Sequence, residues 1–121
     1  MNSNNAVLDL LSDLVKFESI TPDKSECQKY IANYLANLGF ETEYIRYGNV
    51  SNMISTFGAE EPCLVFVGHT DVVPPGDLSQ WKYNPYRLTQ HEGMLIGRGT
   101  ADMKGGIACF MTAIKEHCDA G

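Results

Sequence analysis

The chain has 121 residues, a length that suits one domain or part of one. Hydrophobic residues make up 44% and charged residues 20%, which is ordinary globular composition and argues against an intrinsically disordered chain. The formal net charge of −6, without any cluster of Lys or Arg, excludes nucleic acid as an expected partner because such a chain repels phosphates.

The N-terminal residues predict no targeting signal and no membrane anchor. Residues 1–5 are polar and lack a basic stretch, and no apolar run reaches membrane-spanning length. We therefore expect a cytoplasmic protein with no membrane partner. The four cysteines form no C-x-x-C pair and are expected to be reduced packing residues: Cys27, Cys63, Cys109 and Cys118.

The first third of the chain predicts two helices. From Asn5 to Phe17, apolar residues recur at helical spacing. The second helix is expected to open at Thr21-Pro22, where a hydroxyl cap precedes a proline in the first turn, and to stop at Gly39. The predicted buried positions are Val7, Leu11, Leu14 and Val15 in the first helix and Cys27, Ile31, Tyr34, Leu35 and Leu38 in the second.

The apolar period then changes to two, which predicts strands. Residues 40–47 alternate, a turn is expected at Gly48-Asn49, and residues 52–57 form the second strand. The continuous apolar run over residues 63–67 is typical of a strand that is buried on both faces.

The rest of the chain predicts a loop, two short strands and a helix. Residues 70–85 are rich in Pro, Gly and Asp, and short strands are expected near 86–89 and 94–97. The final helix places Ile107, Phe110, Met111 and Ile114 on one face. This order of elements predicts an α/β fold in which a layered, mixed β-sheet is flanked by helices.

The stretch from Gly68 to Asp77 follows the predicted buried strand, and ligands collect at the carboxyl ends of strands in open α/β sheets. His69 and Asp71 are two residues apart, so they project to the same side of an extended backbone. An imidazole binds zinc through one nitrogen, and a neighbouring carboxylate can accept the other ring N–H. This tripeptide alone leaves open the alternative of a surface histidine in a loop.

The stretch from Gly97 to Gly106 holds four glycines in ten residues, which permits tight turns and a close approach of backbone to a ligand. Asp102 lies in this stretch, just before the last predicted helix. Its carboxylate can cap that helix or bridge two cations with its two oxygens, and both interpretations stay open at this point.

Taken together, His69-Thr70-Asp71 and the segment Gly99 to Gly105 resemble the two N-terminal signatures of the M20 metallopeptidase family. The resemblance covers nearly the whole chain and implies part of a zinc-peptidase-like catalytic domain. It implies that His69 ligates one zinc ion, that Asp102 bridges two, and that Asp71 is the catalytic carboxylate that orients His69. It also implies two zinc ions per active site, for which cobalt can substitute, and a cis peptide bond at Asp102-Met103.

The residues that flank these motifs are similar to M20 members that remove succinyl groups from amino acids, so the implied partner is a small succinylated amino-acid substrate. The M20 deacetylases share the segments Gly68 to Val73 and Gly99 to Gly105 and remain the alternative. The flanking residues that carry this similarity are Thr21-Pro22, Cys27-Gln28, Pro74 to Asp77, Trp81, Asn84-Pro85 and Gly93 to Leu95.

The resemblance also implies parts that this sequence does not contain. Residues 1–121 correspond to the N-terminal portion of the catalytic domain, and the general base, the remaining metal ligands and a dimerisation domain are expected outside it. A homodimer is implied for the full-length enzyme, and the chain alone is expected to be inactive. A non-catalytic fragment that binds a metal or a partner is the alternative from another class.

Five further residues or pairs are expected to lie outside the metal site. Glu60-Glu61 is interpreted as a solvated turn, and neither His91 nor His117 is expected to bind metal. Arg98 and Lys104 flank the Asp102 segment and are candidates for substrate contact, but a structural role is favoured for both.

Overall fold

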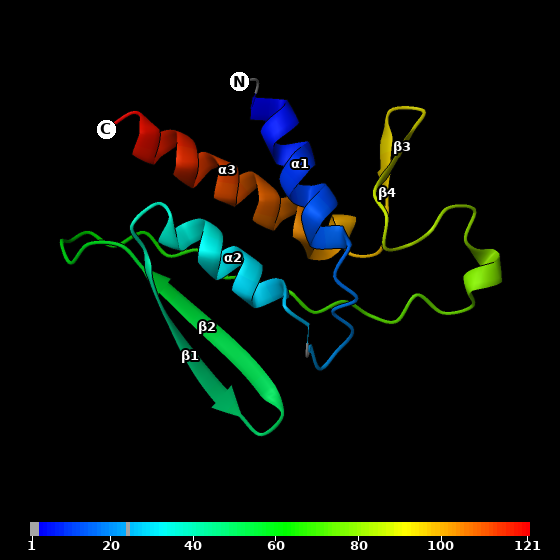
Figure 1. Ribbon diagram of the computed structural model, residues 1–121, viewed down its shortest axis with the longest axis horizontal. Helices are drawn as coiled ribbons and strands as arrows, with labels where there is room; N and C mark the ends of the chain where they lie inside the picture. Colours follow the sequence, from blue (N-terminus) through cyan, green and yellow to red (C-terminus); the bar gives the residue numbers. More distant parts are fainter. Residues whose placement is uncertain (1–2, 24) are drawn as a thin grey trace.

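The computed structural model describes residues 3–23 and 25–121 (Figure 1). In this part of the chain, three α-helices lie beside two antiparallel β-hairpins. The α/β class is therefore confirmed, although the strands form two small sheets and not one layered sheet. The elements are α1 (Ser3–Val15), α2 (Cys27–Ala36), β1 (Glu41–Tyr47), β2 (Val50–Thr56), β3 (Thr89–His91), β4 (Met94–Ile96) and α3 (Gly105–Asp119).

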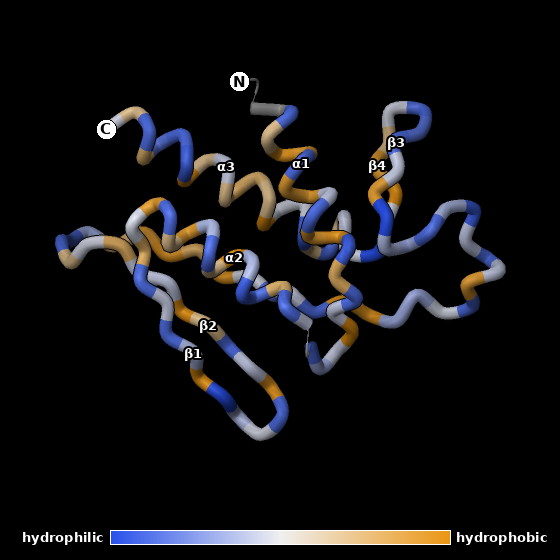
Figure 2. The backbone as a smooth tube through the Cα atoms, in the orientation of Figure 1, coloured by the Kyte–Doolittle hydropathy of each residue, from blue (hydrophilic) through white to orange (hydrophobic). Residues whose placement is uncertain are grey.

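The core lies between the three helices. Each helix repeats apolar residues every three or four positions, so that one side of it is apolar and faces the others (Figure 2). The predicted faces of the first two helices are largely confirmed, while Phe110 and Ile114 of α3 are only partly buried. The buried members are Leu10, Leu11, Leu14, Val15, Cys27, Ile31, Leu35, Ile107, Ala108 and Met111.

The predicted start of the second helix is wrong. Helix α2 begins at Cys27, whose N–H is accepted by the Ser25 hydroxyl at 3.2 Å, and not at Thr21-Pro22. The Thr21 side chain is turned toward Asp71 instead of toward the helix. At the other end of the helix, Gly39 has a φ of +98°, the left-handed conformation that favours glycine after a helix.

Strands β1 and β2 form the predicted hairpin. Tyr47 pairs with Val50 across the turn at Gly48-Asn49, and the register continues to the pair Glu41 and Thr56. Helix α2 lies over one face of the hairpin, where the Gln28 side-chain amide donates to the Ser51 carbonyl at 2.8 Å.

The prediction of a buried strand over residues 63–67 is wrong in this structure. The side chains of Leu64 and Val67 are 89% and 82% exposed, and no strand pairs with the segment in the described part of the chain. A strand requires a hydrogen-bonded neighbour, and an apolar run requires packing on both faces. Only Phe66 is packed closely, because its ring stacks on Phe110 of α3 with centroids 4.0 Å apart.

The loop over residues 70–85 is interrupted by one 3-10 turn, Leu78–Gln80, and β3 begins at Thr89, three residues later than expected. Among the described residues, no helix has the length and apolar character needed to cross a membrane. The cysteines are free thiols, as predicted, but only Cys27 is a buried packing residue; Cys63 and Cys109 are exposed. Their segments lack the packing partners that the interpretation as core residues required.

Candidate metal centre

The loop that carries His69 and Asp71 is fixed by the segment between α1 and α2. Val72 N–H donates to the Ser19 carbonyl at 2.8 Å, and Thr21 N–H donates to the Val72 carbonyl at 3.1 Å. The fully buried Ser19 also donates its hydroxyl to the Thr70 carbonyl at 2.8 Å. Residues 19–21, called the strap below, therefore hold the loop in a defined position.

Asp102 is presented by a wide helical turn, Thr100–Lys104, that runs directly into α3. Asp102 and Met103 have non-helical backbone angles, and the peptide bond between them is cis, as the family resemblance implied. The interpretation of Asp102 as a helix cap is not supported, because Lys104 occupies the N-cap position of α3. The Asp102 carboxylate, 85% exposed, is thus left free for other partners.

Lys104 anchors this turn to the C-terminal end of α1. Its side chain is completely buried, and its ammonium donates to the Leu14 carbonyl at 2.8 Å and to the Phe17 carbonyl at 3.0 Å. Burial lowers the pKa of the Lys104 amine, because the charged form loses its hydration. The structural role favoured for Lys104 is therefore the observed one, and this side chain cannot reach a ligand in the site.

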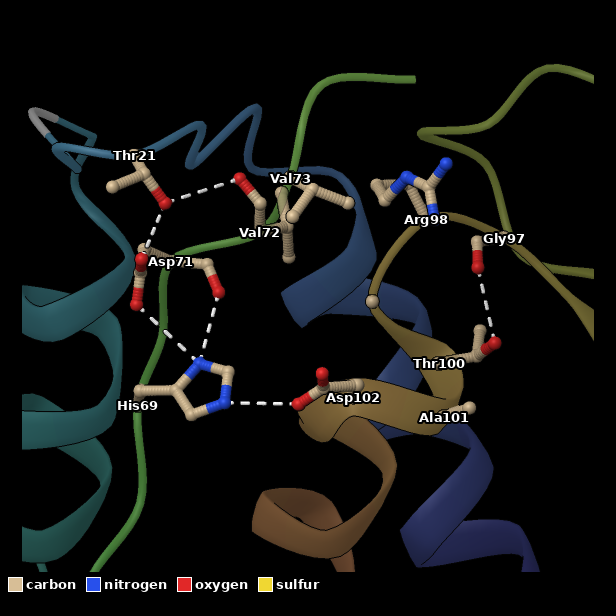
Figure 3. A pocket seen from close by; sticks show the side chains of 11 residues that line it. Thr21, His69, Asp71, Val72, Val73, Gly97, Arg98, Thr100, Ala101 and Asp102 are labelled. Carbon is tan, nitrogen blue, oxygen red and sulfur yellow. Dashed lines mark hydrogen bonds and ion pairs between the residues drawn. The ribbon is translucent and has the colours of Figure 1, made fainter. Parts of the chain in front are cut away.

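The two predicted metal ligands come together. The Nε2 atom of His69 lies 2.9 Å from Oδ1 of Asp102, although 33 residues separate them in the sequence (Figure 3). On the other side of the ring, Nδ1 lies 3.0 Å from the Asp71 backbone carbonyl and 3.3 Å from the Asp71 carboxylate. Asp71 therefore holds the ring from the side away from Asp102, and its backbone carbonyl is the nearer of its two contacts.

These contacts favour a proton on Nδ1 of the ring. Both Asp71 oxygens near Nδ1 accept hydrogen bonds, so Nδ1 carries a proton and donates it. Nε2 then faces the Asp102 carboxylate, which is also an acceptor, and a positive charge is needed between the two atoms. The hydrogen bonds from His69 to the Asp71 carbonyl and the Asp102 carboxylate raise the pKa of His69, so a proton on Nε2 can supply this charge.

A metal ion can take the place of that proton. A neutral imidazole nitrogen and a carboxylate oxygen are both zinc ligands, so the donor set formed by His69 and Asp102 fits zinc. In residues 3–23 and 25–121, however, no group of three or more His, Cys, Asp or Glu side chains converges on one point. His91 is the last residue of β3, beside Glu92, and His117 lies in the last turn of α3, so neither adds a ligand.

A cavity of about 220 Å³ opens over His69, Asp71 and Asp102. Arg98 lines it, but its guanidinium stacks over the Trp81 ring, 5.2 Å from the centroid, and does not extend toward the His69 ring in Figure 3. Thr21 also lines the cavity, and its hydroxyl donates to the Asp71 carboxylate. The sequence pattern indicated a helix cap at Thr21 and carried no signal for this contact.

Comparison with known proteins shows which proteins the chain resembles. Residues 65–121, which contain both motifs, match the family model described as peptidase family M20/M25/M40. The crystal structure of human carnosine dipeptidase 1 superimposes with a TM-score of 0.83 over 96% of this chain and 29% of that chain, and at 23% identity it shows a shared fold. Residues 65–121 therefore resemble the M20 peptidase family.

The chain is also similar to proteins named succinyl-diaminopimelate desuccinylase. It is 48% identical over 105 residues to that of Legionella pneumophila (strain Lens) and 46% identical over 116 residues to that of Bordetella avium (strain 197N). These alignments cover 87% and 96% of the chain but 28% and 31% of the relatives. The chain thus spans less than a third of the length of these curated relatives.

Proposed function

We propose that this chain supplies part of the zinc centre of an amide hydrolase that resembles succinyl-diaminopimelate desuccinylase. The proposed reaction is N-succinyl-LL-2,6-diaminoheptanedioate plus water to succinate plus LL-2,6-diaminoheptanedioate, a step toward lysine and diaminopimelate. The observation that carries the proposal is the 2.9 Å approach of His69 Nε2 to Asp102 Oδ1, two residues that line the cavity. The similarity to desuccinylases over most of the chain supports the choice of substrate.

The residues of the chain have distinct proposed tasks. His69 offers Nε2 to the metal, and its Nδ1 proton is held by Asp71, which keeps the ring in the tautomer that has a free lone pair on Nε2. Asp102 offers Oδ1 beside His69, while its Oδ2 makes no hydrogen bond in the described part of the chain and is open to a second cation. When bound, zinc would supply Lewis acidity toward water and the amide carbonyl, and cobalt would supply the same chemistry.

The remaining parts of the active site belong to the longer protein in this proposal. Residues 1–121 would form the N-terminal portion of the catalytic domain, and the general base, further ligands and a dimerisation domain would follow in a full-length homodimer. The convergence of only two potential ligands in the described chain supports this division, because a zinc site ordinarily has three or four protein ligands.

A calorimetric titration of the chain with zinc tests the metal site. His69→Ala and Asp102→Ala should each reduce zinc affinity at least tenfold, since each removes one of two ligands. His117→Ala is the matched control, because it removes an imidazole in the last turn of α3 and should leave the affinity unchanged. Equal zinc affinity of His69→Ala and the unchanged chain would contradict the proposed site.

The substrate is tested in a protein in which this chain is continued to the full length of the relatives. Such a protein should release succinate from N-succinyl-LL-2,6-diaminoheptanedioate with a higher kcat/KM than it releases acetate from N-acetylornithine. The opposite preference would assign the chain to an acetylornithine deacetylase or another M20 amidohydrolase.

A further inference from the structure

The strap contains one side chain that reaches the metal centre. Thr21 lies in an exposed position at its end, and its hydroxyl donates to Oδ2 of Asp71. The other oxygen of the same carboxylate, Oδ1, lies 3.3 Å from His69 Nδ1. The two oxygens of Asp71 thus have separate partners, one on the strap and one on the proposed zinc ligand.

A carboxylate that is bonded through only one oxygen can rotate about its terminal torsion, because that torsion is broad. The Thr21 hydroxyl has one proton, and its nearer acceptor is the Asp71 carboxylate and not the Val72 carbonyl at 3.5 Å. The hydroxyl therefore fixes the plane of the carboxylate and keeps Oδ1 directed at the His69 ring.

The backbone of the strap is held independently of this hydroxyl. Its links to the loop run from Val72 to Ser19 and from Thr21 N–H to Val72, and they survive any change confined to the Thr21 side chain. Replacement of the hydroxyl by a methyl group thus alters the orientation of Asp71 without releasing the loop.

From this arrangement we infer that Thr21 is a positioning residue of the metal centre and acts on His69 through Asp71. The inference rests on the proposed function, because it assigns Thr21 a role in the site where His69 would bind zinc. The Thr21 hydroxyl contacts the Asp71 carboxylate, and that carboxylate contacts His69. The effect of Thr21 on His69 must therefore depend on the presence of the Asp71 side chain.

The first test needs no metal. In the metal-free chain, NMR measures the solvent exchange of the His69 Nδ1 proton, which Asp71 protects. Thr21→Val should accelerate this exchange about three- to tenfold, because without the hydroxyl the Asp71 carboxylate can rotate away from Nδ1. Thr21→Ser restores the hydroxyl and should restore the slow exchange.

The second test uses zinc alone and a double-mutant cycle with Asp71→Ala. Thr21→Val should weaken zinc binding to the chain about three- to tenfold, and Asp71→Ala should weaken it about 10- to 100-fold. In the Asp71→Ala background, Thr21→Val should have no further effect, since the carboxylate through which it acts is gone. Additive effects would show that Thr21 acts on the fold and not through Asp71, and they would overturn the inference.

A matched control is available in the β1–β2 hairpin. The Thr42 hydroxyl shares a 2.7 Å hydrogen bond with Ser55, so Thr42→Val removes a comparable side-chain contact away from the site. It should change neither the His69 exchange nor zinc affinity. Equal zinc affinity of His69→Ala and the unchanged chain would contradict the proposed function, whereas unchanged His69 exchange in Thr21→Val overturns the positioning role itself.

Discussion

The buried ammonium of Lys104 donates a 2.8 Å hydrogen bond to the carbonyl of Leu14, and this contact joins the turn that carries Asp102 to the C-terminal end of α1. Lys104 also donates to Phe17 at 3.0 Å, so one side chain satisfies two carbonyls at the end of a helix. The position of a proposed metal ligand thus depends on a residue that has no access to the metal.

Lys104→Met should lower the free energy of unfolding by about 2–4 kcal/mol, because it removes two charge-assisted hydrogen bonds and deprives the Phe17 carbonyl of its Lys104 donor, while the Leu14 carbonyl keeps the Phe17 N–H. Urea denaturation followed by circular dichroism measures the change. Lys16→Met is the control: its ammonium is exposed and lies 3.5 Å from the Asp13 carboxylate, so the loss should stay within about 0.5 kcal/mol. Similar losses in both variants would argue against the anchoring role.

Gly99→Ala should destabilise the protein by more than the cost of its backbone conformation. Gly99 has a φ of +90°, and a Cβ placed there would lie 2.7 Å from Cγ1 of Val72. Gly76 has a φ of +77° with nothing within 4 Å, so Gly76→Ala measures the conformational cost alone, about 1–2 kcal/mol. A larger loss for Gly99→Ala in thermal or urea unfolding would confirm the close packing of the two motifs. Equal losses would contradict it.

The metal-free chain should show a His69 titration midpoint above the ordinary value of 6.5, because the Asp71 carbonyl and the Asp102 carboxylate both favour the charged ring. Since the pKa in the folded state is the higher one, this contribution to stability is fully present below about pH 6.5 and is lost as the pH rises through the folded-state pKa. Zinc competes with the Nε2 proton, so zinc affinity should increase with pH across the same interval. An NMR titration of the ring protons checks the midpoint, and Asp102→Asn should lower it.

The cysteines should differ in reactivity. Burial raises the pKa of Cys27 to about 11, so at pH 8 only on the order of one thiol in a thousand is ionised, and its side chain is also inaccessible. A thiol reagent should modify Cys63 and Cys109 quickly in the folded protein and leave Cys27 unmodified. In the unfolded and unreduced protein all four thiols should titrate; a titre of two or fewer would show disulfides.

The chain alone should hydrolyse no appreciable N-succinyl-LL-2,6-diaminoheptanedioate, even with excess zinc. Two converging ligands retain zinc weakly, and a missing general base removes a further factor of about 10²–10⁴. Succinate release by the chain and by a protein of the relatives' full length is the direct comparison. Turnover within about tenfold of the longer protein would require a base inside this chain, with Glu92 and His91 the first to be substituted.

The sequence by itself predicted most of the local elements and the residues of the candidate site. The helical spacing of Leu11 and Leu14 and the alternation around Gly48-Asn49 depend on neighbours along the chain, so pattern alone predicted α1 and the β1–β2 hairpin. The residue types at 69 and 102 left metal ligation open, the resemblance of their motifs to the M20 family implied it, and the structure brings these two side chains within hydrogen-bond distance.

Only the tertiary structure decided how that site is held. Thr21 could cap a helix or bind Asp71, and the choice depends on a parallel bridge between Ile20 and Val72, which are far apart in the sequence. Lys104 could face a ligand or the core, and the carbonyls at the end of α1 determine that it faces the core. The run over residues 63–67 has the composition of a buried strand, but burial requires partners on both sides, and composition cannot supply them.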